Sequence, residues 1–226
     1  MTYVKNLSFQ TKDLGKKSTL LLTFDSSVKG LYQTCFPTVC WLTTFGQTGS
    51  YRIHVTYSSQ LAFSRPQLKN GNIIDAETCV ELNDGEKTTL TRDGSVFQFS
   101  NPVKGVPGYL EALNDSGSIQ DIALGFKNPR DLMPTPVVYF KEVEDASKIV
   151  AEFTPILRAY VTADYQHTTI LQEAIEIPAI WEQNIASLSE STTWNLTRDT
   201  ATGRYNLTQA DEGTLNSSIK PTVVGA

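Results

Sequence analysis

The amino-acid sequence predicts an all-β protein, built as an antiparallel two-sheet β-sandwich or a flattened barrel. Its apolar runs are short and rich in β-branched and aromatic residues, which is typical of strands. Turn-forming residues separate these runs. With 226 residues, of which 40% are hydrophobic and 10% aromatic, the chain can bury a substantial core. We therefore expect a single domain over residues 1–226, with a polar tail that frays from about residue 214.

The strands follow one another along the chain between recognisable turns. In chain order, the sequence predicts strands at Thr19–Phe24, Thr38–Phe45, Tyr51–Tyr57, Thr78–Leu82, Ser95–Phe99, Ile119–Phe126 and Pro136–Val143. The run Tyr51–Tyr57 alternates apolar and polar residues, which predicts a half-buried antiparallel strand. Its polar face includes His54, which we interpret as a surface histidine.

Three turns predict how these strands are joined. Asn83–Gly85 predicts a hairpin that pairs residues 77–82 with residues 86–91. Asp93-Gly94 predicts a reversal into residues 95–100. Near the C-terminus, residues 194–198 and 203–208 are expected to pair.

One short helix is expected near residues 178–188. Pro178 would occupy a favourable position in its first turn. Ile180, Trp181, Ile185 and Leu188 would then fall roughly on one face. The preceding segment, residues 156–177, fits either a helix or strands. Its β-branched and Thr-rich composition favours strands.

Charge, cysteine content and motifs narrow the functional classes. The 19 basic and 24 acidic residues give a net charge of −5 without a basic cluster, so nucleic-acid binding has no support. Met1–Asp13 reads as neither a signal peptide nor a membrane span. Together with three cysteines, an odd number, this predicts reduced thiols in a cytoplasmic protein. The motifs of zinc enzymes, α/β-hydrolases and P-loop proteins are missing, so we expect a protein that is not an enzyme. A dispersed Ser-His-Asp arrangement stays open, because such triads are spatial.

The stretch Leu157–His167 is the most promising candidate for a binding wall. Read as one strand, it places Leu157, Ala159, Val161, Ala163, Tyr165 and His167 on one face, and Arg158, Tyr160, Thr162, Asp164 and Gln166 on the other. The alanines leave space that a core strand would normally fill. A phenol and an imidazole stand beside that space and could orient a guest by hydrogen bonding.

Each candidate residue also has a purely structural interpretation. His167 fits a buried or strand-end histidine as well as a ligand contact. Asp164 could orient His167, bind a cation together with Glu173 or Glu176, or start a turn. Trp181 could cap an opening in the sheet or, like the other two tryptophans, belong to the core.

Two segments of the sequence support a resemblance to a known family. Residues Phe153–Gln166 and Gln60–Arg65 resemble the pink chromoprotein family of mushroom fruiting bodies. This resemblance implies a non-enzymatic protein that holds a small indolone-type pigment related to laccarin. The adjacent carbonyls of such a pigment could chelate a divalent cation, with Asp164 as a further ligand.

We therefore expect non-enzymatic binding of a small conjugated heterocyclic ligand. Tyr160, Tyr165 and Trp181 would supply aromatic contacts, while His167 and Asp164 would fix polar edges. One alternative is a cytosolic lectin that binds glycans through loops such as Asn83–Gly85 or Asn114–Gly117. A second alternative is an enzyme of secondary metabolism with His167 as general base. An apolar strand edge could also support a homodimer.

Overall fold

The computed structural model describes residues 2–25, 30–162 and 164–210. Nearly all of the regular structure is β, so the predicted all-β, sandwich-like class is confirmed. The strands are β1 (Val4–Lys12), β2 (Ser18–Thr23), β3 (Cys35–Pro37), β4 (Val39–Phe45), β5 (Ser50–Ser58), β6 (Leu61–Lys69), β7 (Asn72–Leu82), β8 (Glu86–Asp93), β9 (Val96–Phe99), β10 (Val103–Lys104), β11 (Leu110–Asp115), β12 (Gln120–Phe126), β13 (Thr135–Val143), β14 (Lys148–Ala151), β15 (Ile156–Val161), β16 (Trp181–Asn184), β17 (Ser191–Arg198) and β18 (Tyr205–Gln209). The expected frayed tail lies outside the described residues.

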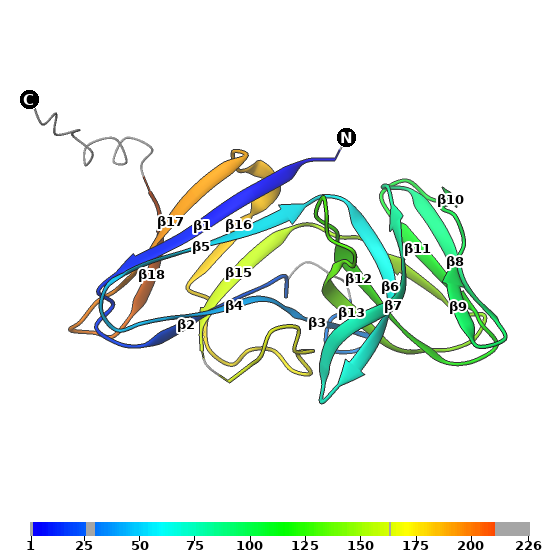
Figure 1. The fold of residues 1–226 in the computed structure, drawn as a ribbon, viewed down its shortest axis with the longest axis horizontal. Coiled ribbons are helices and arrows are strands. Elements are labelled where there is room, and N and C mark those ends of the chain that lie inside the picture. Colours follow the sequence, from blue (N-terminus) through cyan, green and yellow to red (C-terminus); the bar gives the residue numbers. More distant parts are fainter. Residues whose placement is uncertain (1, 26–29, 163, 211–226) are drawn as a thin grey trace, which may run out of the picture.

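The strands are divided among four sheets, which form two sandwiches side by side (Figure 1). Sheet A has the order β18-β17-β1-β5 and sheet B the order β16-β15-β2-β4. Together they form sandwich I, on the left in Figure 1. Sheet C (β3-β13-β12-β6-β7) and sheet D (β10-β8-β11-β14, with β9 on β8) form sandwich II. Most neighbouring strands are antiparallel, but β1 pairs with β17 and β8 with β11 in parallel.

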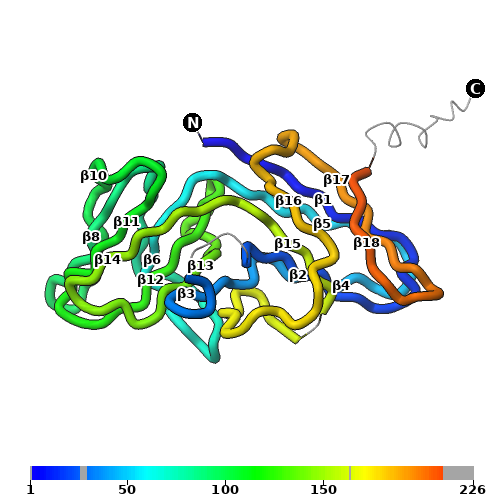
Figure 2. Tube along the Cα trace, turned by 180° about the vertical axis from the view of Figure 1, so that it is seen from behind, coloured from blue at the N-terminus to red at the C-terminus, as the bar shows by residue number. Residues whose placement is uncertain are grey.

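Among the described residues, three uninterrupted stretches run from one sandwich into the other and join them (Figure 2). They are β3 to β4, β5 to β6 and β14 to β15. One continuous core, with residues from all four sheets, fills both sandwiches. Where the sandwiches meet, the ring of Phe24 lies 5.8 Å from Tyr57, 6.3 Å from Phe126 and 5.4 Å from Phe153. Edge-on aromatic packing of this kind favours a fixed arrangement of the two sandwiches.

Sheet A illustrates how sequence alternation positions the core. In β1, Leu7 and Phe9 are fully buried, whereas Ser8 between them faces the outer side. In β5, Val55 and Tyr57 are buried and His54 is exposed, as the alternating sequence predicts. The outer face of sheet A is therefore polar.

Local turn chemistry predicts two of the three expected reversals. The turn after Asp93 pairs β8 with β9, and β17 pairs with β18, as expected. The hairpin around Asn83–Gly85 is wrong, because β7 pairs with β6 in sheet C and β8 belongs to sheet D. One edge of β8 is taken by β11 and the other by β9 and β10, so β7 has no edge of β8 to pair with.

The helix expected near residues 178–188 is also wrong. Trp181–Asn184 forms the edge strand β16, which pairs antiparallel with β15. Pairing with β15 supplies the backbone hydrogen bonds that a helix would have supplied internally. Only Ile185–Ser187 makes one 3₁₀ turn, capped by the Asn184 side chain, which accepts a hydrogen bond from the Ala186 N–H at 3.0 Å.

Within residues 2–25, 30–162 and 164–210, no helix has the length and apolar character needed to cross a membrane.

Candidate functional site

The predicted strand Leu157–His167 has the expected two faces but ends early. In β15, Leu157 and Ala159 are fully buried in the main core, and Arg158 and Tyr160 project from the opposite face. The strand ends at Val161. Residue 162 and residues 164–167 belong to no strand, and Thr168, which follows them, has a φ of 60°. The predicted continuation of the strand to His167 is therefore wrong.

The loop of residues 164–180 folds back over the outer face of sheet B. Its Leu171, Tyr165 and Ile175 pack against outward-facing residues of the sheet. We call this group the outer cluster: Leu21, Tyr32, Val39, Leu42, Tyr160, Tyr165, Leu171 and Ile175. Tyr160 and Tyr165 thus come together through the path of the loop and not through strand register.

A short segment of the loop, Thr168–Leu171, holds it in place, and we call it the clasp. On one side, the Thr168 N–H donates to the Val39 carbonyl at 2.9 Å, and the Leu171 N–H to the Pro37 carbonyl at 2.8 Å. On the other side, the Ile73 N–H donates to the Thr168 carbonyl at 3.1 Å, at the start of β7. The clasp therefore bonds to the β3–β4 stretch and to the tip of the β6–β7 hairpin.

A buried polar group lies beside the outer cluster. The carboxylate of Asp25, whose side chain is only 4% exposed, accepts a hydrogen bond from the Tyr160 hydroxyl through Oδ2 at 2.6 Å. The Nη1 of Arg158 lies 3.7 Å from the Asp25 Oδ1. The Nε of Arg158 donates to Glu182 at 2.5 Å. Arg158 therefore links a buried carboxylate to an exposed one.

The electrostatics of Asp25 depend on its burial. Desolvation raises the pKa of the Asp25 carboxyl, and the Tyr160 hydrogen bond and the Arg158 charge only partly oppose this. Burial also raises the pKa of Tyr32 to about 12, with a further contribution from the nearby Asp25. Within the part of the chain that the structure describes, Asp25 Oδ1 accepts no hydrogen bond. A buried acceptor in this state is costly, so it calls for a functional or solvent explanation.

Two cavities flank the tyrosines of the outer cluster. A cavity of about 550 Å³ is lined by Arg158 and Tyr160 on one side and by residues 175–182 on the other. A second cavity, of about 540 Å³, is lined by Tyr165 and Tyr205 together with Lys16, Lys17 and several hydroxyl-bearing side chains. Both volumes fall in the usual range for small-ligand sites.

Trp181 occupies a different place from the one predicted. It lies on strand β16, and its ring packs 4.7 Å from Trp194 and 6.1 Å from Phe9, between sheets A and B. Its register partner is Ala159, so the small alanine leaves room for the indole. Trp181 also contributes to the lining of the Tyr160 cavity. It does not cap an opening from a helix.

Asp164 and His167 lie on the loop and line neither cavity. Asp164 accepts a hydrogen bond from the Thr162 hydroxyl at 2.8 Å, which is the local turn contact considered for it. His167 is exposed as a residue, yet partial desolvation of its ring lowers its pKa. Among the described residues, no group of three or more His, Cys, Asp or Glu residues is placed to hold a metal ion. The pairing of Asp164 with Glu173 or Glu176 around a cation stays a prediction.

Sequence reasoning missed Asp25 and Tyr32. Asp25 follows Leu21 and Thr23 in alternation on the outer side of sheet B, directly after the apolar run of β2. A carboxylate at the end of such a run is a signal that could have drawn attention to it. Tyr32 gives no local signal, because only the fold brings it to the outer cluster.

Comparison of the chain with family models, with curated proteins and with solved structures finds no match in any of the three.

Proposed function

We propose that this protein binds a small conjugated heterocyclic ligand, without catalysis, in the cavity on the outer face of sheet B. The observation that carries the proposal is the buried Asp25 carboxylate, held by Tyr160 and Arg158, which are two of the side chains that line this cavity. A desolvated charge network of this kind is common at ligand sites and is expensive elsewhere.

The residues of the cavity suit a flat ligand with polar edges. The guanidinium of Arg158 presents a planar set of donors that matches a carbonyl or a delocalised anion. Tyr160 and Ile177 offer aromatic and apolar surface beside it. Asp25 would act through these residues, because it fixes the Tyr160 hydroxyl and lies near the Arg158 charge. Fixed dipoles beside a conjugated guest can favour one of its tautomers.

The resemblance to the pink chromoprotein family gives the ligand its chemical class. An indolone-type pigment carries carbonyl acceptors on a conjugated ring, which Arg158 could bind directly. The family's non-enzymatic role also agrees with a site in which the buried carboxylate is already engaged by Tyr160 and Arg158.

The first test uses the protein from its native source. Its visible absorption spectrum is measured, and denaturation is followed by mass spectrometry of any released compound. We expect an absorption band at longer wavelength than the aromatic residues give, together with release of one heterocycle. A colourless protein that releases no small molecule would overturn the proposal.

A second test locates the site with variants reconstituted with the released compound. Arg158→Gln and Tyr160→Phe, which alter two side chains that line the cavity, are expected to weaken binding at least about tenfold or to shift the absorption band. His54→Ala, on the outer face of sheet A, is the matched control and should leave both unchanged. If the two site variants retain native affinity and spectrum, the ligand binds elsewhere.

A further inference from the structure

A third cavity lies where the two sandwiches meet, away from the outer face of sheet B. Its volume is about 540 Å³. It is lined by Thr2, Tyr3, Ser59, Gln60, Leu61 and Leu82, and by residues 83–84, 108, 110 and 151–154. None of these residues lines the Tyr160 cavity. We call this cavity the junction cleft. Ligand sites are frequent at boundaries of this kind between packed units.

Two aromatic side chains belong to the lining of the junction cleft. Phe153 and Tyr3 are half-buried at the edge of the aromatic group that joins the sandwiches. The Phe153 ring packs 5.4 Å from Phe24, and the Tyr3 ring lies 6.3 Å from Tyr57. Because buried aromatic neighbours pack against both rings, the rings have fixed positions in the lining, with the Lys5 Nζ 5.2 Å from the centroid of the Tyr3 ring.

Two carboxylates lie among the hydroxyl and amide side chains that line the junction cleft. Asp84 and Glu152 are exposed carboxylates on opposite segments. One oxygen of Asp84 accepts the Gly108 N–H at 3.2 Å, and Glu152 forms no hydrogen bond or ion pair with any residue that the structure describes. Among the described lining residues, none carries a positive charge. The cleft therefore suits a ligand whose groups both donate and accept hydrogen bonds, with donors to meet the two carboxylates.

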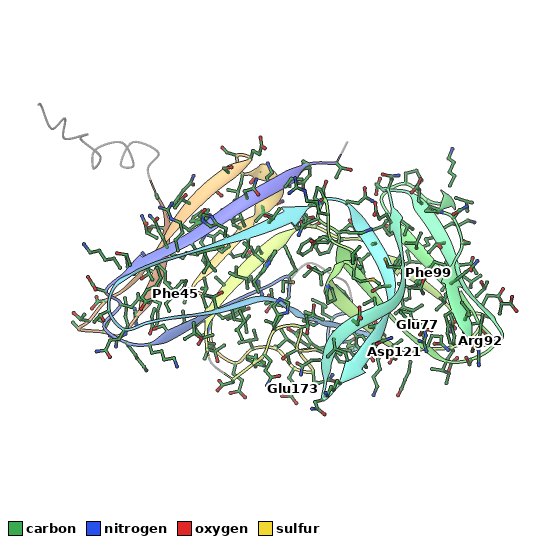
Figure 3. All side chains as sticks on the ribbon, in the orientation of Figure 1. Phe45, Glu77, Arg92, Phe99, Asp121 and Glu173 are labelled. Atoms are coloured by element: carbon green, nitrogen blue, oxygen red, sulfur yellow. The ribbon has the colours of Figure 1, made fainter. Side chains whose placement is uncertain are left out.

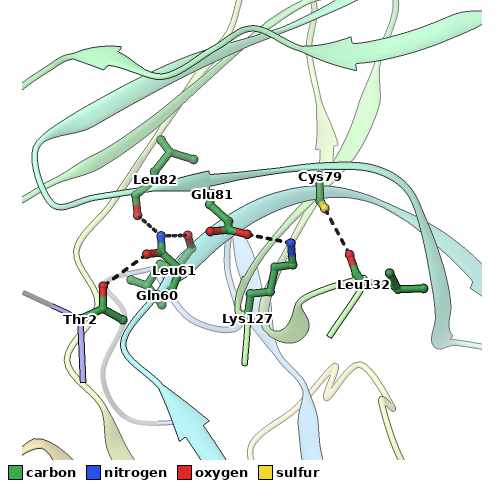
Figure 4. Close-up of polar contacts among 8 residues, drawn as sticks. All are labelled: Thr2, Gln60, Leu61, Cys79, Glu81, Leu82, Lys127 and Leu132. Carbon is green, nitrogen blue, oxygen red and sulfur yellow. Dashed lines mark hydrogen bonds and ion pairs between the residues drawn. The ribbon is translucent and has the colours of Figure 1, made fainter. Parts of the chain in front are cut away.

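Hydrogen bonds hold three segments of the rim together (Figure 4). The Gln60 side-chain amide donates to the Leu82 carbonyl at 3.0 Å and to the Leu61 carbonyl at 3.3 Å, and its oxygen accepts from Thr2 at 3.4 Å. The Tyr3 N–H also donates to the Ser59 hydroxyl at 2.9 Å. The cleft is thus formed in advance, which reduces the entropic cost of binding.

We infer that the junction cleft binds a neutral pyranose, as a free sugar or as the end of a glycan. A pyranose has one face of C–H groups, which can lie on Phe153 and Tyr3, and a rim of hydroxyl donors, which can meet Asp84 and Glu152. Such a site is independent of the heterocycle site and adds a second ligand class to the protein.

The other loop considered for a lectin, Asn114–Gly117, does not offer the same chemistry. Asn114 is fully buried, and its amide donates to the carbonyls of Ser118 and Val143, both at 2.9 Å. This asparagine is committed to holding its own loop, so the glycan inference rests on the junction cleft alone.

The test is a titration of the full-length protein with methyl glycosides of glucose, galactose, mannose and N-acetylglucosamine, followed by NMR chemical-shift changes or calorimetry. We expect saturable binding of at least one glycoside at up to millimolar concentration. Glu152→Ala should weaken it at least about tenfold, because a charge-assisted hydrogen bond is lost. Phe153→Leu, which keeps apolar volume, should weaken it about two- to tenfold.

Two controls separate this inference from the heterocycle proposal. Glu173→Ala removes an exposed carboxylate from the loop at the lower side of the molecule (Figure 3), whereas the N-terminus beside the cleft lies at the upper side (Figure 1). Glu173→Ala and Arg158→Gln should both leave sugar affinity unchanged. Absence of saturable binding to all four glycosides, or native affinity in Glu152→Ala and Phe153→Leu, would overturn the inference and leave the heterocycle proposal untouched.

Discussion

The outer faces of sheets A and B belong to the same sandwich, yet their polar side chains differ in exposure to solvent. On sheet A, polar groups pair across the strands in contact with solvent: Thr56 donates to Asn6 at 3.1 Å, and Gln10 donates to Asn195 at 2.7 Å. On sheet B, the loop of residues 164–180 packs over the face, and Asp25 and Tyr160 become buried.

The difference shows that a covering loop, and not residue type, turns a polar side chain into a candidate binding group. Exposed hydrogen bonds exchange with water and contribute little to stability. Once a loop excludes water, each polar group acquires a large penalty for losing its partner, and its pKa shifts. Asp25 shows this effect, because burial raises the pKa of its carboxyl.

The largest effect is expected from loosening the loop of residues 164–180, which covers the outer face of sheet B and not that of sheet A. Leu171 is 1% exposed and lies in the clasp over the outer cluster. Leu171→Ala should lower the free energy of unfolding by about 2–5 kcal/mol, because a buried side chain is replaced by a cavity. Chemical denaturation measures the change. A decrease in the free energy of unfolding below about 1 kcal/mol would mean that the loop packs weakly on sheet B and that the outer face of sheet B resembles that of sheet A.

A matched pair of hydroxyl deletions sharpens the contrast. Tyr160→Phe removes the donor to the buried Asp25 and should cost about 1–3 kcal/mol. Thr56→Val removes a donor to the exposed Asn6 on sheet A and should change the free energy of unfolding by less than about 0.5 kcal/mol. Equal effects, measured by urea denaturation, would show that the two faces do not differ in desolvation.

The smallest expected effect is a pH dependence that only the covered face should show. The folded protein holds the Asp25 proton more tightly than the unfolded chain, whose carboxyl has the ordinary value of 3.8. The contribution of Asp25 to stability is therefore fully present below pH 3.8 and is lost as pH rises through the folded-state pKa.

Asp25→Asn keeps an acceptor for Tyr160 and removes this titration. As pH rises above 3.8, the wild-type protein should lose stability relative to Asp25→Asn, as measured by denaturation midpoints over a pH series. A difference that stays constant with pH, or that changes in the opposite direction, would contradict the raised pKa.

Local patterns were sufficient where neighbours along the chain decide the structure. Alternation predicts the two faces of β5, and Asp93-Gly94 predicts the reversal between β8 and β9. The first half of the binding wall also follows its alternation, with Leu157 and Ala159 inside and Arg158 and Tyr160 outside.

Local patterns failed where distant segments compete for a backbone edge. Asn83–Gly85 looks like a hairpin turn, but both edges of β8 are occupied by strands later in the chain. Residues 181–184 fit a helix by their spacing, yet the free edge of β15 makes them a strand. The candidate site could not be predicted from local patterns for the same reason: Asp25 and Tyr160 are 135 residues apart and meet only in the folded protein.

The parallel pairing of β1 with β17 also has a consequence for folding during synthesis. Asn6 lies beside Ser191, so this edge of β1 gains its partner only after β17, far later in the chain, has been synthesised. Until then, one edge of β1 can pair only with other strands that are present, including strands of other nascent chains. Correct pairing therefore requires that this edge of β1 stays free of wrong partners until β17 has been made.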